Sequence, residues 1–109
     1  MPERRSFSRI RKRYLVDFVV GERVCAGFTH DLSPTGMFIC SVFLPRPGTT
    51  LRMRVRVGPR TLNMRAKVVR SYRVPQRLSR FVPSGFCVVL QNAPEEYFQF
   101  LASVFRIAA

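Results

Sequence analysis

Two short segments of this 109-residue chain carry side chains suited to binding a ligand. The first is RSFSR, in which three residues separate Arg5 from Arg9. This spacing places both guanidinium groups on one side of the segment, whether it is helical or extended. An arginine presents two donors to the O6 and N7 atoms of guanine, or lies flat on a purine ring. Arg4 adds a third guanidinium beside the pair.

The second segment is DLSPTG, residues 31–36, and its residue types favour a turn. Asp31 is able to accept hydrogen bonds from a guanine edge, and Ser33 to donate to a phosphate or a base. Gly36 lets the backbone turn closely against a ligand. Asp31 and Ser33 are equally suited to stabilising the turn itself. Together the two segments fit a ligand that contains guanine rings and phosphates.

The net charge also points to an anionic partner. Nineteen basic residues against six acidic ones give a formal charge of +13, and all but Lys12 and Lys67 of the basic residues are arginines. Such a field favours nucleic acid, a nucleotide, phospholipid or an acidic protein. A coding bias toward arginine on a solvated surface would produce the same excess.

Composition excludes several classes of protein. With 47% hydrophobic residues the chain is not disordered throughout. No apolar run approaches the roughly 18 residues of a membrane span, and no apolar stretch typical of a secretory signal follows the basic N-terminus. We therefore expect a cytoplasmic protein. Cys25, Cys40 and Cys87 lack the spacing of a disulfide framework or a zinc site, so we expect them in the core.

Catalysis is not expected. The chain has one histidine, which excludes a metal site with several histidine ligands. His30, Asp31 and Ser33 are too close in sequence to converge as a triad, and no nucleophile elbow or phosphate-binding loop is present. We predict no enzyme activity, no metal and no cofactor.

The remaining pattern predicts one domain, in which a flexible basic arm at residues 1–13 precedes a folded unit at 14–109. In residues 50–57 arginines alternate with apolar residues, and residues 65–67 extend a basic outer face. Asn92 is suited to cap a helix that has Pro94 in its first turn. An apolar stripe at helical spacing follows from Tyr97 to Phe105. The expected strands are residues 14–20, 23–29, 37–40, 50–57, 61–72 and 85–90.

Six short strands and a terminal helix predict an all-β fold, a closed antiparallel barrel that leaves no strand edge exposed. Within that pattern, the segments ERRSFSRI (3–10) and THDLSPTGMFI (29–39) make the chain resemble the PilZ domain family. Pro47-Gly48 and residues 66–70 and 85–90 support the likeness, which spans residues 3–106. The resemblance implies a single-domain, PilZ-like split barrel.

The resemblance also implies that the chain binds cyclic di-GMP, a bacterial second messenger. Arg5 and Arg9 would bind guanine and phosphate groups, and Asp31, Ser33 and Gly36 would shape the opposite wall. Arg4 is suited to holding a second, stacked ligand molecule, so that the ligand would bind as a dimer. Arg70 is a further candidate contact.

We expect the arm to be loose without ligand, because its cations repel one another. Ligand binding would order it, and the ordered arm would signal to a partner protein. Two alternatives remain at this point. One is a small basic barrel that binds nucleic acid non-specifically, which the lack of aromatic residues on the basic faces disfavours. The other is a protein-interaction barrel that binds no nucleotide.

Overall fold

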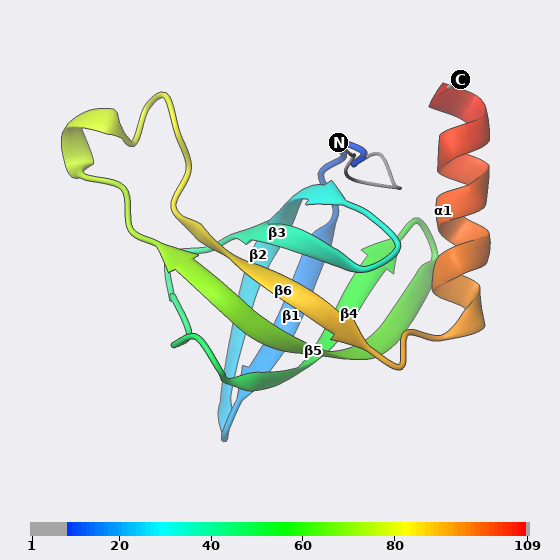
Figure 1. The fold of residues 1–109 in the computed structure, drawn as a ribbon, viewed down its shortest axis with the longest axis horizontal. Helices are drawn as coiled ribbons and strands as arrows, with labels where there is room; N and C mark the ends of the chain where they lie inside the picture. The colour runs from blue at the N-terminus through cyan, green and yellow to red at the C-terminus, as the bar shows by residue number, and fades with distance from the viewer. Residues whose placement is uncertain (1–8, 109) are drawn as a thin grey trace, which may run out of the picture.

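The six predicted strands form a closed antiparallel barrel in the order β1-β2-β3-β6-β5-β4, which confirms the expected fold class (Figure 1). This computed structural model describes residues 9–108, with side chains described through residue 105. A short 3-10 turn, η1 (Gln76–Leu78), interrupts the connection between the last two strands. The elements are β1 (Leu15–Val20), β2 (Arg23–Leu32), β3 (Gly36–Cys40), β4 (Thr50–Val57), β5 (Arg60–Tyr72), β6 (Gly85–Gln91) and α1 (Glu95–Ala108).

Strand alternation builds the core. Along β4 every second residue is buried, and the arginines between them are exposed, as the alternation predicts. Inside the barrel, Phe18 of β1 packs edge-to-face on Phe86 of β6 with ring centroids 5.1 Å apart. The residues that fill the barrel therefore come from strands on both sides of it.

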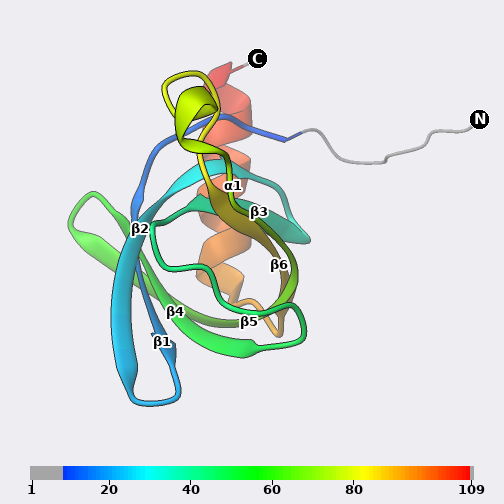
Figure 2. The ribbon, with the colours of Figure 1, turned by 90° about the vertical axis from the view of Figure 1, so that its left-hand side faces the viewer.

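Helix α1 stands along the barrel on the side opposite to the long β5–β6 loop (Figures 1 and 2). Its apolar stripe packs into the core, where Tyr97, Leu101 and Val104 are buried as the helical spacing predicts. The predicted cap is wrong, because the helix begins at Glu95 and not directly after Asn92. Asn92 instead turns the chain with a φ of 54°, a conformation that asparagine tolerates. In the described part of the chain, no helix is long and apolar enough to cross a membrane.

The second strand is longer than predicted. We expected it to end at Thr29 and a turn to begin at His30, yet β2 continues to Leu32. A register shift between Thr29 and Asp31 lets Asp31 pair with Phe38 of β3. Pairing with a neighbouring strand thus overrides the local turn preference, and only residues 33–36 form the turn. Asp31 consequently lies on a strand and not on a loop.

The segment before β1 is held by the barrel from Arg9 onward. Ile10 is only 9% exposed, and it exchanges backbone hydrogen bonds of 2.8 and 2.9 Å with Leu32. The Thr29 hydroxyl donates to the carbonyl oxygen of Lys12 at 2.6 Å and accepts from the Tyr14 amide at 2.8 Å. Residue 9 is thereby brought next to the end of β2. Residues 1–8 lie outside the described part, so the flexibility of the arm stays a prediction.

Candidate functional site

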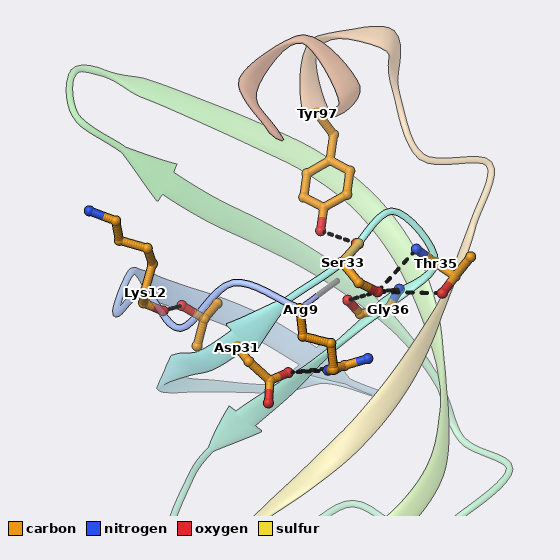
Figure 3. Close-up of polar contacts among 8 residues, drawn as sticks. Arg9, Lys12, Asp31, Ser33, Thr35, Gly36 and Tyr97 are labelled. Carbon is orange, nitrogen blue, oxygen red and sulfur yellow. Dashed lines mark hydrogen bonds and ion pairs between the residues drawn. The ribbon is translucent and has the colours of Figure 1, made fainter. Parts of the chain in front are cut away.

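The turn between β2 and β3 is closed by its own hydrogen bonds (Figure 3). The Ser33 amide donates to the carbonyl oxygen of Gly36 at 2.9 Å. The Ser33 hydroxyl oxygen accepts from the amides of Gly36 and Thr35 at 3.2 and 3.3 Å. Ser33 is 2% exposed, so its side chain satisfies backbone donors that the turn would otherwise bury unpaired.

A residue from the helix completes the turn. The Tyr97 hydroxyl donates to the carbonyl oxygen of Ser33 at 2.8 Å, and both residues are buried (Figure 3). Burial raises the pKa of the Tyr97 phenol well above its usual value, so the group remains a protonated donor at neutral pH. The sequence pattern puts Tyr97 in the apolar stripe of the helix but does not indicate this hydrogen bond. The two residues are 64 positions apart, and no local pattern links them.

Gly36 is required by close packing between strands. A Cβ atom at this position would overlap the carbonyl oxygen of Val88 on β6, and Gly36 is itself buried. The sequence suggested a close approach of the backbone to a ligand, whereas the close approach in the structure is to β6. Gly36, the first residue of β3, therefore allows this strand to pack closely against β6.

The structure brings one residue of each motif into contact. Arg9 donates through Nε and Nη2 to Oδ1 of Asp31 at 2.8 and 2.6 Å (Figure 3). The Arg9 side chain is 34% exposed and that of Asp31 18% exposed. Two of the five guanidinium N–H donors are used in this pair, which leaves the others able to contact an anion. The pair is charge-assisted and lies at the surface.

Arg9 and Asp31 line a surface pocket of about 440 Å³. Besides the motif residues, its wall contains aromatic and aliphatic side chains that neither motif predicts. Phe38 and Tyr72 meet edge-to-face with centroids 6.1 Å apart, and Tyr72 is 43% exposed. The strand alternation places both rings on the outer face of the barrel, and this pattern could have indicated that they line a surface pocket. The complete lining is Arg9, Asp31, Thr35, Gly36, Phe38, Val69, Tyr72, Cys87, Val88 and Val89.

The other predicted site residues are placed as follows. Arg70 pairs with Cys87 across β5 and β6, so it stands beside the pocket without lining it. Ser33 is buried and does not line the pocket either. Arg4 and Arg5 lie outside the described residues.

The three cysteines are free and half-buried, whereas we expected them inside the core. Cys25 does pack against the core from its edge, so the expectation holds in part for that residue. The strand alternation explains the position of Cys87: its neighbours Phe86 and Val88 point inward, so its own side chain faces the pocket. Burial raises the pKa of the Cys87 thiol, which keeps the group neutral. Within residues 9–108 no group of three or more histidine, cysteine or acidic residues is placed to hold a metal ion.

A larger pocket, of about 680 Å³, lies elsewhere on the barrel. It is lined on the outer side of β4 and β5 by Arg52, Arg54 and Arg65, and by Asp17 of β1. Asp17 accepts from Arg54 at 3.2 Å and from Arg56 at 2.9 Å. No described residue of either predicted motif lines this pocket. The smaller pocket is the better candidate because residues of both motifs meet in it.

Comparison with known proteins identifies the family to which the chain belongs. The family model of the PilZ domain matches residues 3–102, and the chain therefore belongs to the PilZ domain family. No curated protein sequence matches the chain.

Solved structures share the fold at low sequence identity. The PilZ domain with c-di-GMP of YcgR from Escherichia coli matches with a TM-score of 0.71 and 15% identity, over 94% of this chain and 88% of that one. The PilZ domain of CeSA from a cellulose-synthesizing bacterium gives 0.61 and 17%, over 94% and 99%. The inhibitor of motility MotI (DgrA) of Bacillus subtilis gives 0.74 and 17%, over 92% of this chain but only 48% of MotI.

Proposed function

We propose that this chain is a receptor for cyclic di-GMP that acts by binding and not by catalysis. The observation that carries the proposal is the meeting of Arg9 and Asp31, one from each motif, at the rim of a single pocket. Membership of the PilZ family supports the proposal, as does the likeness to a YcgR domain whose structure contains c-di-GMP.

The chemistry of the pocket suits the two parts of this ligand. Within residues 9–108, Arg9 has unused donors for phosphate oxygens or a guanine edge, and the second carboxylate oxygen of Asp31 is able to accept from guanine N–H groups. Tyr72 and Phe38 add aromatic surface on which a base is able to stack. Ser33 and Gly36 hold the wall in place without needing to touch the ligand.

The residues before Arg9 would complete the site. Arg5 would join Arg9 on the ligand, and Arg4 would hold a second, stacked molecule. Ordering of this arm over the pocket would create a new surface and thereby signal to an effector protein. Arg70, which is exposed on β5 beside the pocket, would contact a ligand phosphate.

Isothermal titration with cyclic di-GMP at physiological salt tests the proposal, with GTP as the control ligand. We expect saturable binding to the wild type that is lost in Arg5→Ala/Arg9→Ala. The matched control is Arg46→Ala, an exposed arginine that does not line the pocket. A stoichiometry near two ligands per chain would support the stacked dimer. Binding that survives the double substitution would overturn the site, and no binding at all would overturn the function.

The second candidate function is non-specific nucleic-acid binding, which the outer face of β4 and β5 favours. Arg52 lies directly opposite Arg65 on the paired strands, and within residues 9–108 neither makes an ion pair. Like charges in that arrangement attract anions. No aromatic side chain lines the described pocket there, which makes stacking of bases unfavourable. Binding of single-stranded DNA that weakens steeply with salt and disappears in Arg52→Ala/Arg65→Ala would support it.

A further inference from the structure

The connection between β5 and β6, residues 73–84, projects from the barrel as a hook (Figures 1 and 2). The hook exposes large apolar side chains close together in sequence. Phe81 is 77% exposed, Val82 50% and Leu78 49%. Single exposed apolar residues are ordinary, but three within five positions make a patch that core packing does not explain.

The hook is held in one shape by hydrogen bonds. The amide of Leu78 donates to Pro75 at 2.8 Å, and those of Phe81 and Val82 donate to Leu78 at 2.9 and 3.0 Å. At the base, the Val74 amide donates to the Ser84 hydroxyl at 2.9 Å. The apolar side chains are therefore presented on a preformed turn, which reduces the entropy lost when they bind a partner.

Cations surround this apolar tip. Arg73, Arg77 and Arg80 alternate with the apolar residues, and the segment 73–84 contains no acidic residue. All three arginines are exposed. The β3–β4 connection adds to the same end of the barrel, since Val42, 91% exposed, lines one pocket together with Arg73 and Ser79.

This combination favours a lipid surface over a protein groove. The hook, residues 73–84, has twelve residues, which is few against the roughly 20–30 residues that each partner contributes to a stable protein interface. An apolar tip with a cationic rim instead suits the boundary of an anionic bilayer. There, Phe and Leu enter between the headgroups, and arginines bind the lipid phosphates. The net charge of +13 would steer the chain to such a surface.

We propose that the hook binds anionic phospholipid, with Phe81 and Leu78 inserted at the headgroup boundary and Arg77 and Arg80 on the phosphates. This surface is separate from the candidate nucleotide pocket, and its residues do not line that pocket. The proposal goes beyond the receptor function and does not depend on it. It would place this PilZ domain at the surface of a membrane.

Tryptophan fluorescence gives a direct test, because the chain contains no tryptophan. The Phe81→Trp variant is mixed with vesicles of phosphatidylglycerol and phosphatidylcholine in equal parts, and with vesicles of phosphatidylcholine alone. We expect a blue shift of emission with the first vesicles and none with the second. The matched control is Phe98→Trp on α1, since Phe98 is 40% exposed but lies outside the hook. The emission of this control variant should not shift with either kind of vesicle.

Vesicle co-sedimentation separates insertion from attraction by net charge alone. Phe81→Ser should weaken binding to the anionic vesicles about tenfold or more, because burial of one phenylalanine is worth at least that factor. Phe98→Ser should bind as the wild type does. Equal binding by Phe81→Ser and wild type, or an unshifted emission from the Phe81→Trp variant, would overturn the proposal. Unchanged melting temperature and cyclic di-GMP titration of each variant exclude unfolding and keep this test independent of the receptor function.

Discussion

The two sides of the candidate site are built differently. On one side, the turn at residues 33–36 is buried and is fixed by its own backbone, by the Ser33 hydroxyl and by Tyr97. On the other side, Arg9 is 34% exposed and is held by one ion pair with Asp31. One wall of the site is therefore preformed, whereas in the other wall Arg9 is able to exchange its ion-pair partner. Arg9 is able to trade its carboxylate partner for a phosphate, while the turn keeps its shape.

The contrast has an energetic consequence. A buried hydrogen bond that loses one partner costs about 1–3 kcal/mol, whereas an exposed ion pair contributes about 0–1 kcal/mol. Substitutions in the turn should therefore lower the free energy of unfolding first, and substitutions of Arg9 should lower ligand affinity first. Four substitutions test this division.

The largest loss of stability should follow Gly36→Ala. The added methyl group would overlap the Val88 carbonyl oxygen, and both groups belong to paired strands that cannot move apart freely. We expect the free energy of unfolding to fall by about 3 kcal/mol, measured by urea denaturation. Thr35→Ala, at the exposed neighbouring position, should change it little. Wild-type stability of Gly36→Ala would show that β3 and β6 are not closely packed here.

Tyr97→Phe should cost about 2 kcal/mol, because it leaves the buried Ser33 carbonyl without its donor. The phenol has a raised pKa in the folded state, so its contribution is complete below pH 10 and declines at higher pH. The stability difference between wild type and Tyr97→Phe should therefore shrink as the pH rises above 10. Thermal unfolding of both proteins between pH 7 and 11 measures this. A difference that stays constant or grows would contradict the assignment.

Ser33→Ala should cost about 1 kcal/mol, since the turn loses one acceptor but keeps the bond from the Ser33 amide to Gly36. We expect cyclic di-GMP affinity to fall only a few-fold, because the wall keeps its backbone. Ser103→Ala on the exposed side of α1 serves as the control. Complete loss of binding with unchanged stability would mean that the Ser33 hydroxyl contacts the ligand directly.

Arg9→Ala should have the smallest effect on folding, within about 0.5 kcal/mol. Its effect on binding should be large in comparison, because loss of one charge-assisted contact weakens cyclic di-GMP binding about tenfold or more. Urea denaturation and isothermal titration of the same sample give both numbers. A large drop in stability would show that Arg9 is structural, and the two walls would then not differ as proposed.

Much of the fold followed from local pattern. The alternation in β4 and β5 and the helical stripe from Tyr97 to Val104 set which side chains face inward, because strand and helix periods are local properties. The extension of β2 to Leu32 did not follow, since the sequence of 30–36 favours a turn and only pairing with β3 and Ile10 opposes it.

The features of the candidate site also fall into those that local sequence predicts and those that depend on tertiary contacts. The residue types of the two motifs already indicate their chemistry: arginines for a phosphate or guanine, a carboxylate opposite them, and a glycine where the chain must come close. Three contacts depend on how the chain folds: Arg9 meets Asp31, Tyr97 binds Ser33 from 64 residues away, and Phe38 and Tyr72 form the remaining wall. The physical reason is that residue type is a local property. Contact between distant segments depends on barrel closure and register, to which every strand contributes.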